Sequence, residues 1–60
     1  MPQTTPTAPI GWTPTHDAFI KDLYLKGEDA ESIRILLEAE FPAMRGRISK
    51  IWIRERVLRL

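Results

Sequence analysis

The sequence has no cysteine among its 60 residues. Disulfide bonds and thiolate metal sites, the two commonest ways of stabilising so short a chain, are therefore excluded. Histidine occurs once, at His16, and a single histidine with no second ligand nearby makes a poor zinc site, so we expect it on the surface. A chain of this length buries only about 60% of its unfolded surface. Its stability must come from packed side chains or from a partner.

Long apolar runs are missing as well, and so is the basic start with an apolar stretch that marks a secretory signal. We therefore expect an intracellular, cytoplasmic chain with no membrane partner. Apolar residues make up 43% and charged residues 28% of the sequence, as in a typical globular domain. This composition favours a small folded domain over a disordered chain.

Catalytic patterns are also absent. The two serines, Ser32 and Ser49, have no histidine at a motif spacing, which leaves no pair of nucleophile and base. The acidic residues between Glu28 and Glu40 do not follow the alternation of a calcium-binding loop. We expect no enzymatic activity, no cofactor, no metal ion and no small-molecule substrate.

Proline and threonine are concentrated in residues 1–11, which hold three of the five prolines and little that could be buried. Such a segment cannot offset the entropy lost on folding. We expect residues 1–11 to be a disordered tail and residues 12–60 to form one domain.

Capping signals around apolar residues at three- and four-residue spacing predict two helices. Thr13 can cap the first helix, Pro14 fits its first position, and Gly27 ends it. Asp29 can cap a second helix that stops before Pro42. The expected buried positions of the two helices are Phe19, Ile20, Leu23, Tyr24, Ala30, Ile33, Leu36 and Leu37.

A third helix is expected from about Arg47 to the C-terminus. At 100° per residue its side chains fall into three arcs. A core-facing arc holds Ile48, Ile51, Trp52 and Leu58, a basic arc holds Arg47, Lys50 and Arg54, and an apolar arc on the far side holds Ile53, Val57 and Leu60. The pattern predicts an all-α fold, a small trihelical helix-turn-helix bundle, with Trp12 and Trp52 as core anchors.

Charge is distributed very unevenly along the chain. Residues 1–44 carry three basic and seven acidic residues, a net charge of −4, whereas residues 45–60 carry six basic residues and one acidic residue, a net charge of +5. A basic segment behind an acidic body is typical of a phosphate-binding helix. It could equally pair with the acidic segment within the molecule.

The basic arc predicts a surface for double-stranded DNA. Arg47, Lys50 and Arg54 lie at i, i+3 and i+7, so one helix face could follow the major groove, while neighbouring cations contact the flanking phosphates. Arginines that are merely solvated near the C-terminal end of a helix would give the same charges. The predicted DNA-binding residues are Arg45, Arg47, Ser49, Lys50, Arg54, Arg56 and Arg59.

The far-side apolar arc indicates an alternative function. This arc would be exposed, and its residues lie at i, i+4 and i+7: Ile53, Val57 and Leu60. They would form an interface, or a junction with a further C-terminal domain. The chain would then be a protein–protein interaction or oligomerisation module, in which Val57→Asp should abolish self-association.

The chain resembles the N-terminal DNA-binding domain of GcrA-like bacterial and phage regulators in the residues Trp12-Thr13, Phe19-Ile20-Lys21, Leu23-Tyr24, Gly27, Asp29-Ala30 and Ile33. It is similar, more loosely, to Myb/SANT and homeodomain-like trihelical modules. The similarity runs without gaps from Trp12 through Leu37, about half of the chain, and consists mostly of core and capping residues.

The resemblance implies a double-stranded DNA-binding module whose third helix enters the major groove. The chain departs from the family in its longer connection from Glu38 to Gly46 and in its C-terminal ending, which leaves the register of the third helix open. We expect a module of a phage or bacterial transcriptional regulator, or of a DNA packaging or recombination protein. The groove-facing positions would be Arg47, Ser49, Lys50 and Arg54.

Overall fold

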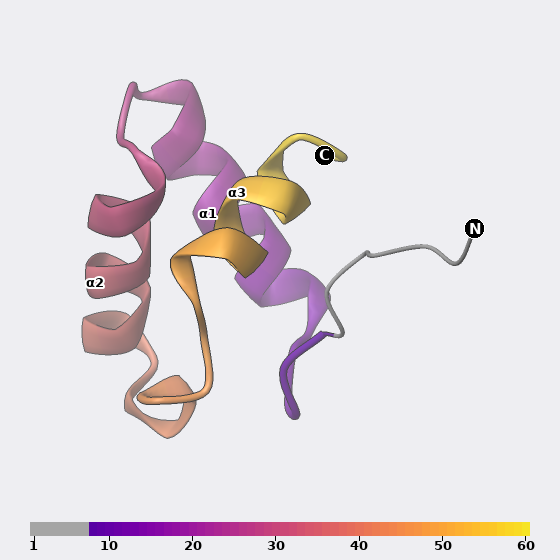
Figure 1. Ribbon diagram of the computed structural model, residues 1–60, viewed down its shortest axis with the longest axis vertical. Helices are drawn as coiled ribbons and strands as arrows, with labels where there is room; N and C mark the ends of the chain where they lie inside the picture. Colours follow the sequence, from indigo (N-terminus) through magenta and orange to yellow (C-terminus); the bar gives the residue numbers. More distant parts are fainter. Residues whose placement is uncertain (1–7) are drawn as a thin grey trace.

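The computed structural model describes residues 8–60, and most of the predicted disordered tail, residues 1–11, lies outside the described residues. The helices are α1 (Pro14–Leu25), α2 (Ala30–Glu40) and α3 (Lys50–Val57), with a 3-10 turn, η1 (Pro42–Met44), between α2 and α3. Each α-helix packs against the other two, and Figure 1 shows α3 lying across α1 with α2 beside them. The predicted all-α trihelical fold is confirmed.

Helix α1 begins where its capping residues predict. Thr13 has an extended backbone, and Pro14 occupies the first helical position, where its missing N–H costs nothing. The helix ends at Leu25, and Gly27 follows with a φ of +96°, a left-handed conformation that glycine adopts without steric cost.

His16 is buried, contrary to the surface position expected from the sequence. It is 8% exposed, and its ring stacks on Trp12 and contacts Phe41, with centroid separations of 5.1 and 4.4 Å. Its Nδ1 atom accepts the backbone N–H of Thr13 at 3.1 Å and lies 2.8 Å from the Thr13 hydroxyl. The imidazole therefore takes the place that glutamate has in a capping box, while its faces join an aromatic cluster.

Helix α2 has the start and the end that its sequence predicts. The Asp29 carboxylate accepts the backbone N–H of Ser32 at 2.8 Å, and this contact is the main reason why the pKa of Asp29 lies below its ordinary value. The helix ends at Glu40 because Pro42 disfavours helical geometry in the residue before it. The η1 turn then carries Met44 into the core.

Helix α3 starts later than predicted. The chain leaves η1 through Gly46, whose φ is +78°, and reaches the N-cap of α3 at Ser49, so Arg47 and Ile48 precede the helix. Ile48 is nevertheless buried and belongs to the core, although it lies in the segment before the helix. Its position therefore says nothing about which face of α3 points inward.

The core face of α3 is also different from the predicted one. Ile53 and Val57, expected on the far side, are 0% and 8% exposed, whereas Ile51 and Leu58, expected in the core, are 64% and 65% exposed. Ile53 and Val57 lie at i and i+4 and share a face with Trp52, which packs as predicted. When Ile48 is left out of the helical wheel of α3, the remaining apolar residues favour the face with Ile53 and Val57 as the core face.

The hydrophobic core takes side chains from every element. Trp12 and Trp52, the predicted anchors, meet edge to face with ring centroids 5.6 Å apart. Tyr24 and Leu36, which were expected to be buried, are 45% and 40% exposed. The buried core consists of Ile20, Ile33, Leu37, Met44, Ile48, Trp52, Ile53 and Val57, with Trp12, Phe19, Leu23, Ala30 and Phe41 packed around it.

The register of α3 can be tested with two matched substitutions. Ile53→Ala should lower the free energy of unfolding by about 2–5 kcal/mol, because it leaves a cavity in the core, whereas Ile51→Ala should change it by less than about 0.5 kcal/mol. Urea denaturation followed by tryptophan fluorescence measures both values. If Ile51→Ala lowered the free energy of unfolding more than Ile53→Ala does, the register predicted from the sequence would be correct.

Candidate nucleic-acid interface

The predicted DNA-binding residues lie in the segment before α3, along α3 and just beyond its end. Arg45, Arg47, Lys50 and Arg54 are exposed. Their side chains make no hydrogen bond or ion pair with any of residues 8–60. These four residues, which we call the open cations, come from one continuous segment of ten residues, 45–54.

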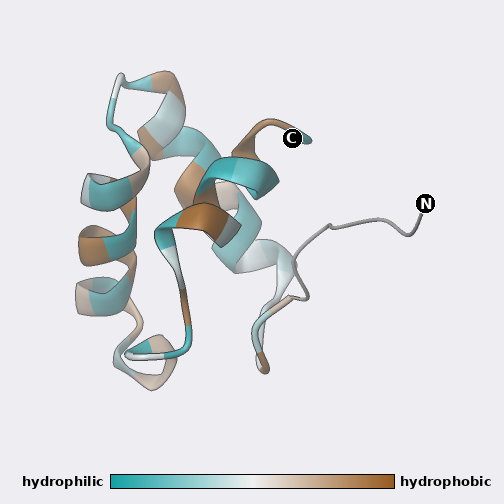
Figure 2. Cartoon of the chain, in the orientation of Figure 1, coloured by the Kyte–Doolittle hydropathy of each residue, from teal (hydrophilic) through white to brown (hydrophobic). Residues whose placement is uncertain are grey.

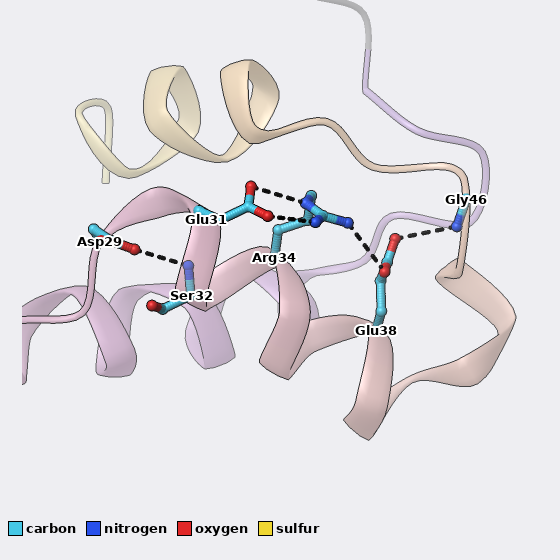
Figure 3. A network of polar contacts seen from close by, with 6 residues as sticks. All are labelled: Asp29, Glu31, Ser32, Arg34, Glu38 and Gly46. Carbon is cyan, nitrogen blue, oxygen red and sulfur yellow. Dashed lines mark hydrogen bonds and ion pairs between the residues drawn. The ribbon is translucent and has the colours of Figure 1, made fainter.

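A polar network holds the turn that carries the first two open cations. The Glu38 carboxylate accepts the backbone N–H of Gly46 at 3.1 Å and also Nη1 of Arg34 at 3.2 Å (Figure 3). The same guanidinium group donates to Glu31 through Nη2 at 2.6 Å and through Nε at 3.3 Å. Arg34 thus pairs with two carboxylates of α2. Glu38 holds the backbone of the turn at Gly46, and Arg45 and Arg47 on either side keep no pair among residues 8–60.

Ser49 has a structural role at the start of α3. Its Oγ atom accepts the backbone N–H of Trp52 at 3.0 Å, so the side chain caps the helix. The cap sets the position at which helical geometry begins, and therefore the directions of all later side chains. The cap uses one acceptor site of the Ser49 hydroxyl, and the groove contact predicted for this residue stays a prediction.

The outward face of α3 combines basic and apolar side chains. Lys50 and Arg54 lie at i and i+4, with Ile51 beside them and Leu58 beyond the last turn, on the side away from the core. Figure 2 shows the hydrophilic middle of α3 between apolar segments at its two ends. We call the residues Lys50, Ile51, Arg54 and Leu58 the outward face.

Shallow hollows separate the outward face from the beginning of α2. One of about 350 Å³ is lined by Asp29, Ala30, Glu31, Lys50, Ile51 and Arg54. Another, of similar volume, is lined by Tyr24, Asp29, Ala30, Ile33, Arg54, Val57 and Leu58. Asp29, Ala30 and Arg54 border both hollows.

Two carboxylates face the first residue of α3. The pKa of Asp29 is lowered chiefly by the N–H of Ser32 and that of Glu31 chiefly by Arg34, and the charge of Lys50 lowers both further. Both residues are exposed to solvent, so this attraction is screened. The beginning of α2 is thus an acidic border of the outward face.

Arg56 was predicted to contact DNA phosphates, and it is instead bound within the molecule. Its Nε and Nη2 atoms donate to the two carboxylate oxygens of Asp17 at 2.8 and 2.7 Å. The indole Nε1 of Trp12 donates to the same carboxylate at 2.8 Å, and the guanidinium carbon lies 6.0 Å from the ring centroid of Trp52. The hydrogen bonds from Arg56 lower the pKa of Asp17, with a smaller effect of Trp12 in the same direction.

Arg59 is exposed beyond the end of α3 and also interacts with another group of the molecule. It is therefore not one of the open cations. Of the seven predicted contact residues, four basic side chains remain available to a partner. The other three, Ser49, Arg56 and Arg59, interact with other groups of the molecule.

The far-side apolar arc predicted for α3 does not exist. Ile53 and Val57 belong to the core, and only Leu60 of the three is exposed. The alternative interaction module loses the surface on which it was based. Val57→Asp would place a charge in the core and unfold the chain rather than separate two copies of it.

Comparison with protein-family models, curated proteins and solved structures gives no match to this chain. The resemblance to GcrA-like regulators therefore stays a prediction. Within residues 8–60 no helix is long and apolar enough to cross a membrane. The same part of the chain has no cluster of three or more histidine or acidic residues that could hold a metal ion.

The Asp17–Arg56 pair is the contact that sequence reasoning missed. Its partners are 39 residues apart, and no motif spacing joins them. The uneven charge distribution left open the alternative that the basic segment pairs with the acidic segment within the molecule. Arg56 forms such a pair with Asp17. The only local signal was the position of Asp17 in the first turn of α1, where a carboxylate also favours the helix dipole.

The capping role of Ser49 predicts a matched pair of variants. Ser49→Ala should lower the free energy of unfolding by about 1 kcal/mol, because the N–H of Trp52 loses its acceptor, whereas Ser49→Asn should leave it nearly unchanged. Thermal unfolding followed by circular dichroism measures both. Equal stability of Ser49→Ala and the parent chain would contradict the cap.

The Asp17–Arg56 pair predicts a pH dependence of stability. Because the folded pKa of Asp17 is lowered from 3.8, its contribution is complete above that value and is lost as the pH falls through the lower folded pKa. Asp17→Asn should cost about 1–2 kcal/mol at pH 7 and little at low pH. Urea denaturation at pH 7 and at pH 2 compares the variant with the parent. A difference that does not shrink at pH 2 would exclude the charged pair as its cause.

Proposed function

We propose that this chain is a double-stranded DNA-binding module that uses the outward face of α3 and the turn before it. The observation that carries the proposal is that Arg45, Arg47, Lys50 and Arg54 are exposed and unpaired within the described residues. The parent protein would be a transcriptional regulator or a DNA packaging or recombination protein, acting where bacterial or phage DNA lies, in the cytoplasm.

The distribution of ion pairs supports a polyanionic partner. Outside the segment 45–54, Lys26, Arg34 and Arg56 each pair with a carboxylate, and these pairs use Asp17, Asp22, Glu31 and Glu38. Arg59 interacts with another group, and Lys21 on α1 is a single exposed cation apart from the segment. The four open cations therefore form a local excess of positive charge in a chain whose formal net charge is only +1. Such an excess on one segment is the electrostatic footprint of phosphate binding.

The geometry of α3 suits a major groove. The helix is short, is joined to the core along one side, and presents Lys50 and Arg54 on the other. A groove about 12 Å wide admits one α-helix, and arginine can donate two hydrogen bonds to the O6 and N7 atoms of guanine. Arg45 and Arg47 precede the helix and would reach phosphates at its N-terminal end.

The acidic border limits how the duplex can lie. Asp29 and Glu31 stand across a hollow from Lys50 and would repel a phosphate strand placed over the beginning of α2. The backbone that contacts the protein should therefore pass over the turn of Arg45 and Arg47, where Glu38 is already engaged with Arg34 and Gly46.

The test is fluorescence-anisotropy titration with a mixed-sequence duplex at several salt concentrations. Each neutralised phosphate should add about 0.9 to the slope of log K against log salt, so four open cations allow a slope of up to roughly 4. Lys50→Ala should weaken binding to all sequences and reduce the slope. Arg47→Ala, at a phosphate-contacting position before the helix, should likewise weaken binding to all sequences, whereas Arg54→Ala should also lose discrimination between base pairs at a particular position.

Lys21→Ala is the matched control, because Lys21 is an exposed lysine of α1 outside the proposed surface. It should keep the affinity and salt slope of the parent chain. Equal affinity of the Lys50, Arg47 and Arg54 variants and the parent, or no binding of the parent at low salt, would contradict the proposal.

A further inference from the structure

Ile51 is an apolar side chain in an unusual place. It is 64% exposed, has no part in the core, and lies on the outward face between two cations, one residue after Lys50 and three before Arg54. Burial therefore does not explain its presence there. Lys50 and Arg54 flank it with charges that favour a polyanion, so its partner should combine phosphate groups with an apolar group.

The position of Ile51 along the helix decides what it can reach. Ser49 caps α3, which places Ile51 in the first helical turn. The N-terminal residues of a recognition helix are the ones that meet base edges in the major groove. Leu58 is equally exposed, but it lies seven residues, or about 10 Å, further along the axis and lines the hollow beside Tyr24.

Only one apolar group projects into the major groove of unmodified DNA, the C5-methyl group of thymine. We propose that Ile51 is a specificity-determining residue that packs on the methyl group of a thymine next to a base pair contacted by Arg54. The inference rests on the proposed DNA binding and adds a readout of thymine to it. The other exposed apolar residues of the described chain, such as Ile35 on α2, do not lie between open cations.

The size of the effect follows from burial of one methyl group. About 0.8 kcal/mol per buried methyl or methylene group corresponds to roughly a fourfold change in Kd. Replacing thymine by uracil removes this methyl group and leaves base pairing and backbone charge unchanged. The exchange therefore separates methyl contact from phosphate contact.

The experiment begins with affinity selection from randomised duplexes by the parent chain. Uracil then replaces each thymine of the selected duplex in turn, and anisotropy gives the Kd of the parent, Ile51→Ala and Ile35→Ala. The parent and Ile35→Ala should lose about fourfold affinity at one uracil position. Ile51→Ala should bind the thymine and uracil duplexes equally and keep the salt slope of the parent.

Other outcomes have distinct meanings. If no thymine of the selected duplex can be replaced by uracil with a loss of affinity, the role of Ile51 is overturned while DNA binding stands. The same holds if Ile51→Ala still binds the thymine duplex more tightly than the uracil duplex. No binding of the parent to any duplex overturns the proposed function and this inference with it. Circular dichroism checks that Ile51→Ala is folded, as expected for a residue outside the core.

Discussion

The position of α3 depends on one carboxylate. Asp17 accepts hydrogen bonds from the indole of Trp12 and from two nitrogens of Arg56, so it joins the segment before α1, the first turn of α1 and the last turn of α3. Charge-assisted, bidentate hydrogen bonds of this kind are directional as well as strong. In a chain with no disulfide, they fix the rotation of a helix only eight residues long, which packing alone would hold less firmly.

A second constraint acts at the other end of α3. Glu38 holds the backbone of Gly46, and Ser49 caps the helix three residues later, so the connection is fixed at both ends without using a basic side chain. Together with the Asp17–Arg56 pair, these contacts separate Arg56 from the open cations, while Arg59 interacts with another group of the molecule. Arg56 holds the fold together, and the open cations face outward. The proposed DNA surface is formed by the open cations, which take no part in these structural contacts.

Local signals predicted α1 and α2 well. The ends of α1 and α2 follow from Thr13, Pro14, Asp29 and Pro42, because capping and proline geometry depend on a few adjacent residues. The burial of Ile20, Ile33 and Leu37 follows from helical periodicity. Four of the seven predicted contact residues are exposed and unpaired within residues 8–60, as DNA binding requires. Their role in binding DNA stays a prediction.

The register of α3 could not be predicted in the same way. Its residues are apolar on several sides, so the choice between Ile51 and Ile53 as core depends on where the helix starts, and Ser49 was not recognised as its cap. Two further features depend on tertiary contacts. His16 is buried because Trp12 and Phe41 enclose it, and Arg56 is engaged because α1 and α3 meet at Asp17.

The central claim is that Arg56 is structural while the arginines of the open segment are available to a duplex. The most direct test is a titration of the chain with duplex DNA, followed through the Nε–Hε signals of its arginines by ¹⁵N NMR. We expect the signals of Arg47 and Arg54 to shift with added DNA, while those of Arg56 and Arg34 stay in place. Shifts at Arg56 comparable to those at Arg54, or no shift at any arginine, would contradict it.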